Sequence, residues 1–181
     1  MTNANDRKTA PNTDPLPPDD LNRNLTIARP NTDQSLPHIA MVGDTYTVLM
    51  SGKDTAGMYC LFDMHVPPCG GPSPHRHDFE EMFSILEGEV EFHFRGEKLQ
   101  LKAGETINIP ANAPHFFRNE STSTVRLLCM CSPAGQEEFF MRVGVPVDGR
   151  TTQPPEPNDV QKKEFQSKAK ALALQYRNEL L

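Results

Sequence analysis

The sequence has no long hydrophobic run and no excess of positive charge, and each absence excludes a class of protein. No apolar stretch approaches the roughly 18 residues of a membrane-spanning helix, so we expect no membrane span. Only 36% of the residues are hydrophobic, and the formal net charge is −6. We also expect no nucleic-acid partner, because phosphate binding requires a basic surface.

The beginning of the chain lacks the apolar segment of a secretory signal, so the expected location is cytoplasmic. Residues 1–20 are instead rich in Asn, Thr, Asp and Pro. Their few apolar side chains cannot offset the entropy lost on ordering. We therefore expect a disordered N-terminal arm over residues 1–20, and contact with a partner subunit is the alternative role.

Cysteine is sparse, and its four positions are Cys60, Cys69, Cys129 and Cys131. In a cytoplasmic protein these are expected to be reduced thiols. Cys129 and Cys131 have the same parity within one strand-like run, and we interpret them as small core residues. A metal-binding Cys-x-Cys pair is the alternative.

Short runs of β-branched and aromatic residues alternate with turns rich in Gly and Pro. The strands expected from these runs cover residues 38–42, 45–50, 57–66, 79–86, 90–94, 98–101, 106–109 and 124–131. Many short strands with few helices between them predict an all-β sandwich or barrel.

Two helices are expected after the last strand. Ser132-Pro133 has the pattern of an N-cap and first turn before a helix over residues 134–143. Residues 145–157 are rich in Pro and predict a loop. A second helix is expected from residue 158 or 159 toward Leu181, with an apolar stripe of Phe165, Ala169, Leu172, Tyr176 and Leu180. We expect this stripe to pack on the outside of the barrel, with a lid or a dimer contact as the alternatives.

Candidate metal ligands gather between residues 75 and 81. His75, His77 and Glu81 have the same parity, so one extended strand would direct all three to one face. His115, on a later segment, completes a set of three imidazoles and one carboxylate, which suits a divalent transition metal. The adjacent Glu80 has the opposite parity and is expected to point away.

These residues belong to two motifs. The first contains Gly70, His75, His77, Glu81 and Gly88, and the second contains Gly104, Pro110, Asn112, His115 and Asn119. Together they resemble the two conserved motifs of the cupin superfamily, and the short segment between them resembles that of compact single-domain cupins. Gly70 lies one residue nearer to His75 than usual. Asn112 replaces the usual Gly, and we expect it to keep the turn because Asn tolerates left-handed backbone.

The resemblance implies a double-stranded β-helix, the jelly-roll or cupin barrel, followed by C-terminal α-helices. We expect this barrel over residues 21–145, and a linker and C-terminal helix over residues 146–181. The implied metal ligands are His75, His77, Glu81 and His115. They would hold one divalent ion of Fe, Mn, Ni, Co, Cu or Zn.

The compact domain, the intact ligand set and the nearby Phe residues resemble quercetin-dioxygenase-like cupins. This implies a metal-dependent dioxygenase acting on a small aromatic or enol-type substrate, with Glu81 as ligand and general base. The alternatives are a non-catalytic small-molecule-binding or sensor cupin, and a metal-dependent isomerase or lyase. A homodimer is expected from the family resemblance and from exposed sheet edges.

The surroundings of the site follow from the same segments. Met64, Phe79, Phe83 and one of Phe116 and Phe117 are expected to form a dry pocket. His38 and His93 are interpreted as ordinary surface or core residues. The same interpretation applies to His65, with a position lining the cavity as the alternative.

Overall fold

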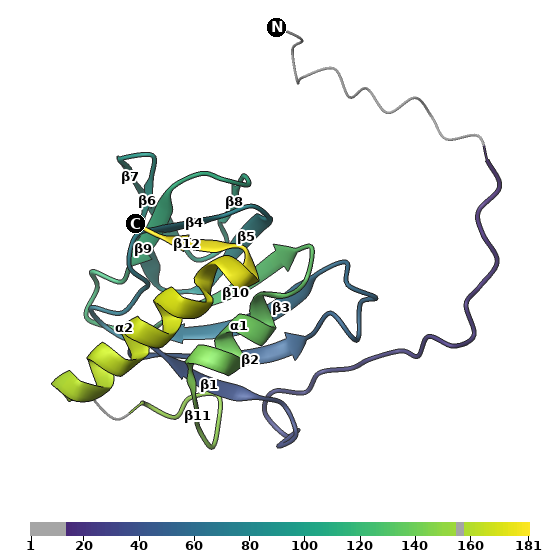
Figure 1. Ribbon diagram of the computed structural model, residues 1–181, viewed down its shortest axis with the longest axis horizontal. Helices are drawn as coiled ribbons and strands as arrows, with labels where there is room; N and C mark the ends of the chain where they lie inside the picture. The colour runs from purple at the N-terminus through teal and green to yellow at the C-terminus, as the bar shows by residue number, and fades with distance from the viewer. Residues whose placement is uncertain (1–13, 155–157) are drawn as a thin grey trace, which may run out of the picture.

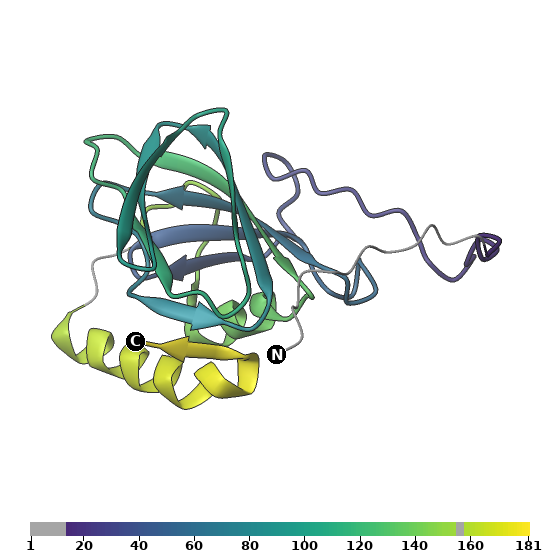
Figure 2. The same ribbon diagram turned by 90° about the horizontal axis from the view of Figure 1, so that it is seen from above.

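The chain folds into two antiparallel β-sheets that enclose one core, with two helices on the outside (Figures 1 and 2). The structure, a computed structural model, describes residues 14–154 and 158–181. This architecture confirms the expected double-stranded β-helix with C-terminal helices. No helix within the described ranges is long and apolar enough to cross a membrane.

The larger sheet has seven strands. In spatial order they are β11 (Val145–Pro146), β1 (His38–Met41), β2 (Asp44–Met50), β3 (Cys60–Val66), β10 (Val125–Ser132), β5 (Glu80–Glu87) and β8 (Thr106–Ile109). The smaller sheet has five, in the order β12 (Asn178–Leu180), β4 (His75–His77), β9 (His115–Arg118), β6 (Glu89–Phe94) and β7 (Glu97–Lys102). The eight strands expected from the sequence all occur, with ends shifted by three residues or fewer.

The core lies between the two sheets and follows the alternation of each strand. In β10 every second residue is buried, beginning with Val125 and ending with Cys131. Phe62 from the larger sheet and Phe92 from the smaller one are completely buried. Burial of an aromatic side chain of this kind contributes about 1.5–3 kcal/mol. The pairing of inward faces therefore both closes the barrel and fixes which side chains enter it.

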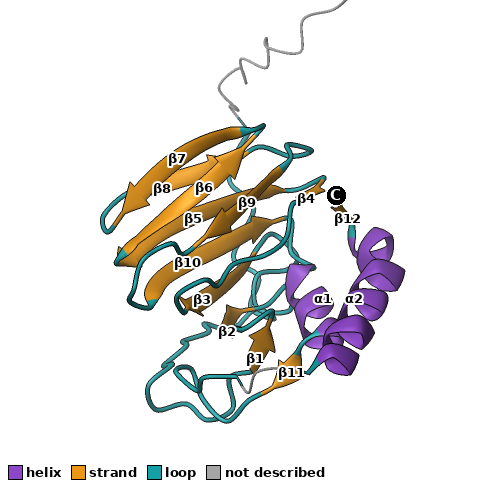
Figure 3. Ribbon diagram, turned by 90° about the vertical axis from the view of Figure 1, so that its left-hand side faces the viewer, coloured by secondary structure: helices purple, strands orange, loops and turns teal. Residues whose placement is uncertain are grey.

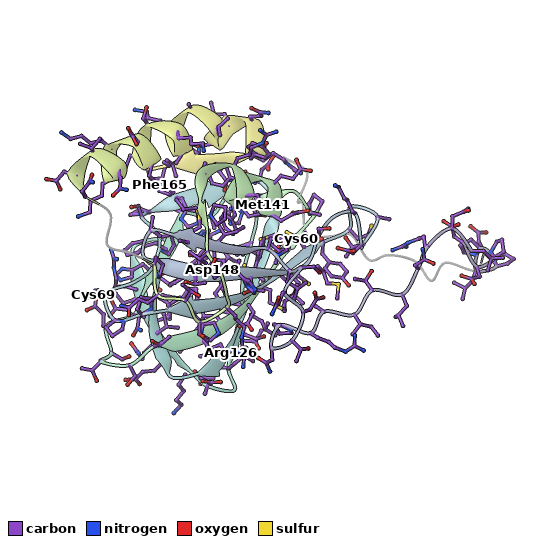
Figure 4. The ribbon with its side chains drawn as sticks, turned by 90° about the horizontal axis from the view of Figure 1, so that it is seen from below. Cys60, Cys69, Arg126, Met141, Asp148 and Phe165 are labelled. Carbon is purple, nitrogen blue, oxygen red and sulfur yellow. The ribbon has the colours of Figure 1, made fainter. Side chains whose placement is uncertain are left out.

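Two helices cover one side of the barrel (Figure 3). They are α1 (Gln136–Val143) and α2 (Asp159–Ala173), and a short 3-10 helix, η1 (Leu174–Tyr176), follows α2. Phe165 and Ala169 of the expected stripe lie on the side of α2 that packs against the core. Figure 4 labels Phe165 on this helix. Asn158 forms a capping box with Gln161, which fixes the start of α2.

The start of α1 differs from the prediction. Ser132 is the last residue of β10, and the N-cap of α1 is Gly135. The backbone of Gly135 has φ of 134°, a conformation that favours glycine. The helix therefore begins after the Ser132-Pro133 pair instead of at it.

The end of the chain also differs from the prediction. The helix expected to run toward Leu181 stops at Ala173, and η1 follows it. Arg177 then adopts a left-handed conformation with φ of 62°. The chain reverses there and Asn178–Leu180 pair with β4 as strand β12. As a strand, these residues pair with the backbone groups at the open edge of β4. A longer helix would leave those groups of β4 without this partner.

Two further segments are informative. The expected loop at residues 145–157 contains the short edge strand β11, in which Pro146 is tolerated because edge strands do not need every donor. Part of the expected arm, residues 1–13, lies outside the described residues. Residues 14–29 are almost all exposed and run away from the barrel (Figure 1). The boundaries of the arm and of the domain stay predictions.

Candidate metal centre

The candidate ligands come from three strands on both sheets. His75 and His77 lie on β4 of the smaller sheet, and Glu81 lies on β5 of the larger sheet. The single strand expected over residues 75–81 is therefore bent at Asp78 and Phe79. The bend carries the chain from one sheet to the facing one, so that Glu81 still meets the histidines.

His115 joins the set from β9, the neighbour of β4. It is paired directly with His75, and the two ring centroids are 4.4 Å apart. His77 Nε2 and His115 Nε2 each lie 3.0 Å from Oε2 of Glu81. One ligand atom from each of the four residues falls within 4.8 Å of all the others. The structure thus brings together all four residues that the motifs predict.

Each imidazole is oriented by a backbone carbonyl. His75 Nδ1 lies 2.9 Å from the carbonyl oxygen of Ser73. At the same distance, His77 Nδ1 faces the carbonyl oxygen of Phe79, and His115 Nδ1 faces that of Ala113. A carbonyl oxygen only accepts hydrogen bonds, so Nδ1 carries the proton in all three rings. In the neutral rings the lone pairs therefore lie on Nε2, the nitrogen that faces the site.

This donor set fits a cation. In their neutral form, with the proton on Nδ1, the rings of His77 and His115 present lone pairs to the same carboxylate oxygen of Glu81. Acceptors that converge in this way repel one another unless a positive charge lies between them. Three imidazole nitrogens and one carboxylate oxygen suit a divalent transition metal.

The electrostatic environment shifts the pKa of three of the four candidate ligands. Burial acts to lower the pKa of His115, but the hydrogen bond with Glu81 outweighs it and raises this pKa. Burial, together with the neighbouring His115, lowers the pKa of His75 to about 4, so its imidazole is neutral near pH 7. Burial acts to raise the pKa of Glu81, but hydrogen bonds and charge from His115 and His77 in their protonated form outweigh it and hold this pKa well below its ordinary value. Glu81 is therefore a carboxylate.

The loops around the site hold the two motifs together. Asn112 has φ of 69°, so it keeps the left-handed turn as expected. Its backbone N–H donates to the carbonyl oxygen of His77 at 2.6 Å. Gly71, in the loop before His75, has φ of 122°, and a Cβ there would lie 2.2 Å from the carbonyl oxygen of Phe117. This close approach requires glycine.

Aromatic side chains lie on the inner side of the candidate ligands' strands. Phe79 stacks on His77 with ring centroids 3.9 Å apart, and Phe83 contacts Phe117 within the core. Phe117 points inward, whereas Phe116 stacks on the ring of His93 at 4.0 Å. Of the two alternatives in the sequence, Phe117 is the one buried beside the site.

The residues expected to point away from the site do so. Glu80 is exposed, and its carboxylate accepts hydrogen bonds from the side chain of Asn108 and the backbone N–H of Ala111. His65 belongs to the outer face of β3, beside Asp63, which pairs with Arg126. The cavity-lining alternative for His65 is therefore wrong.

Two residues near the site were interpreted in the sequence as core, with a metal-binding Cys-x-Cys pair as the alternative. Cys129 Sγ lies 3.2 Å and Cys131 Sγ 3.6 Å from Oε1 of Glu81. Burial raises the pKa of the Cys129 thiol to about 12 and raises the pKa of Cys131 well above its ordinary value. Both are therefore thiols. Their shared parity is visible in the sequence, but the pairing of β10 with β5 is not.

Access to the four ligands is uneven. His77, Glu81 and His115 are 2–4% exposed, whereas His75 is only partly buried. A separate groove of about 890 Å³ lies between residues 26–37 and α1, and none of the four ligand residues lines it.

Comparisons with known proteins concern the family and the fold of the barrel. Residues 62–131, which include the four ligands, match the family described as "Cupin domain". Quercetin 2,3-dioxygenase of Bacillus subtilis is 28% identical over 111 residues, which cover 60% of this chain and 33% of that protein. An uncharacterized protein of Aquifex aeolicus is 39% identical over 71 residues, covering 39% of this chain and 58% of that protein. The chain therefore matches from a third to just over half of the length of these relatives.

A solved structure supports the fold. The crystal structure of a predicted oxalate decarboxylase from Thermotoga maritima superimposes with a TM-score of 0.55 at 20% identity. The match covers 60% of this chain and 99% of that one. At this identity the likeness concerns the barrel alone.

Proposed function

The barrel of this chain is a cupin domain, and from that premise we propose that the protein is a metal-dependent dioxygenase acting on a small aromatic or enol-type substrate. The observation that carries the proposal is the convergence of three oriented imidazoles and the Glu81 carboxylate. The partial match to quercetin 2,3-dioxygenase supports the choice of reaction.

The ligands of the proposed ion are His75, His77, Glu81 and His115. Bound there, a divalent ion of Fe, Mn, Ni, Co, Cu or Zn would supply Lewis acidity toward a substrate oxygen, and a redox-active one would supply dioxygen chemistry. The protein contributes the geometry. Carbonyl oxygens of Ser73, Phe79 and Ala113 fix the three rings, and Phe79 covers one face of His77.

Glu81 has a second proposed role as general base. Its carboxylate is ionised, so Oε2 can accept the proton of a substrate hydroxyl group. Burial of Glu81 favours the protonated acid, whereas hydrogen bonds from His115 and His77 in their protonated form favour the carboxylate. Proton acceptance therefore becomes more favourable when a substrate moves Oε2 away from the histidines.

Oxygen uptake tests this proposal. The apoprotein is loaded separately with each of the six metals and mixed with a panel of flavonols, catechols and diketones. Consumption of dioxygen is expected with at least one pair. Glu81→Gln is expected to lower that rate by at least about 100-fold, because it removes the base, while elemental analysis shows that the metal is retained.

Glu80→Gln is the matched control. Glu80 is adjacent to Glu81 but exposed and directed toward Asn108, so this variant should consume dioxygen like the wild type. Tight binding of a panel compound without uptake or product under any metal would contradict the proposal and favour a binding or sensor protein. Product without oxygen uptake would favour an isomerase or lyase.

We also propose that the protein is a homodimer. The exposed segment of residues 14–29 carries large apolar side chains, among them Leu16, Leu21 and Leu25, each more than 80% exposed. Contact with a second subunit would bury them. Light scattering at tens of micromolar, a rough working range for such interfaces, is expected to give twice the monomer mass, and a monomer would contradict the proposal. The cytoplasmic location and the absence of a nucleic-acid partner stay predictions.

A further inference from the structure

A row of side chains crosses the inner face of the larger sheet behind Glu81. Cys131 of β10 is paired directly with Glu81 of β5 on one side and with Cys60 of β3 on the other. Cys129 lies two residues before Cys131 and faces the same way. All three cysteines are completely buried. This places thiols against a carboxylate where a core would ordinarily have only apolar groups.

The contacts divide the two oxygens of Glu81 between two sets of partners. Oε2 faces the histidines, at 3.0 Å from Nε2 of both His77 and His115. Oε1 faces the opposite way and lies 3.2 Å from Cys129 Sγ and 3.6 Å from Cys131 Sγ. A buried carboxylate oxygen without a donor would be costly, and here the donors are S–H groups.

We propose that Cys129 and Cys131 are positioning residues of the metal centre, whose thiols donate to Oε1 and hold Glu81 so that Oε2 alone faces the ion. The inference rests on the proposed metal site and adds a function for residues outside the ligand set. Partners of ligating groups commonly tune the geometry and affinity of a site. With Oε1 engaged, Glu81 binds through one oxygen and leaves the ion's other positions to substrate.

The test uses Co(II), whose visible spectrum reports coordination geometry, and Zn(II) for infrared spectra. In Cys129→Ala/Cys131→Ala, Oε1 loses both donors. We expect Co(II) affinity, measured by competition with a chelator, to fall about tenfold. We also expect the visible spectrum to change. The two carboxylate stretching bands of Glu81 are identified because they disappear in Glu81→Gln. In the double alanine variant, the frequency difference between these bands should decrease as binding through both oxygens becomes populated.

Two control variants separate donation from packing. Cys129→Ser/Cys131→Ser keeps a donor at each position and should retain the wild-type spectra and affinity. Cys60→Ala removes a buried thiol of the same row that contacts Cys131 but not Glu81, and it should also behave like the wild type. If the double alanine variant does not fold, Cys129→Ala alone removes the closer donor and should give the same changes in smaller measure.

Several results would overturn the inference. Spectra and affinity unchanged in the alanine variants would show that the thiols only fill space. A sulfur-to-cobalt charge-transfer band in the wild type, lost in the alanine variants, would show that the cysteines are ligands and not donors to Glu81. The first result leaves the proposed metal site intact, whereas the second changes its ligands. Failure of the wild type to bind Co(II) would overturn both the inference and the proposed function.

Discussion

His75→Ala combined with His115→Ala is expected to abolish metal binding. The double substitution leaves only His77 and Glu81, and two ligands do not hold a divalent transition ion firmly in water. Elemental analysis of wild-type protein, purified without added metal, should give about one equivalent per chain, as a single mixed nitrogen and oxygen site implies. The variant should give almost none, and its oxygen uptake should disappear with the metal.

The matched control removes two histidines that lie outside the set. His38 contacts the side chain of Thr47, and His93 contacts Glu91, so His38→Ala/His93→Ala should keep its metal. Full loading that persists in His75→Ala/His115→Ala would place the metal elsewhere. The group of Glu81, Cys129 and Cys131 would then be the next site to examine.

Deletion of residues 177–181 is expected to weaken metal binding by about tenfold or more, the usual consequence of loosening the support of a ligand. Strand β4 carries two of the four ligands, yet only one of its residues, His75, is paired with β9. Strand β12 pairs with all three residues of β4. Without β12, most of the ladder that fixes His75 and His77 is lost. Chelator competition measures the affinity, and hydrogen exchange at β4 should accelerate.

Glu179→Gln is the control for this deletion. It removes the ion pair between Glu179 and Arg76, in which both side chains are nearly half exposed, and keeps the backbone ladder. Exposed ion pairs contribute little to stability, so this variant should bind metal like the wild type. If the deletion variant also binds like the wild type, then β9 and the loops alone suffice to hold β4.

The four candidate ligands could be identified from the sequence because their selection depends on local features. Gly and Pro mark the turns of the two motifs, and the shared parity of His75 and His77 survives in β4. Glu81 was predicted for a partly wrong reason. It does not continue the same strand but enters from the facing sheet after the bend, a route that parity alone does not reveal.

The last strand could not be predicted, because its conformation is determined by a distant partner. Leu180 was assigned to the apolar stripe of the expected helix, and nothing local marks Asn178–Leu180 as a strand. They become one because β4 has an open edge and because the side chain of Asn178 donates to Gln136 in α1. Tertiary contacts of this kind override local preference. The thiol contacts of Glu81 were missed for the same reason, since register between strands is a property of the fold.

The pairing of β12 with β4 also determines when, during protein synthesis, the candidate metal centre can be completed. Arg76 and Glu179 are neighbours in space but 103 positions apart in sequence. A ribosome adds about 5–20 residues per second. Several seconds therefore pass between the synthesis of β4 and that of β12. During that interval the edge of β4 is open to other chains. The nascent protein therefore exposes His75 and His77 before β12 can fix their strand. We expect firm metal binding only after β12 has been synthesised and paired.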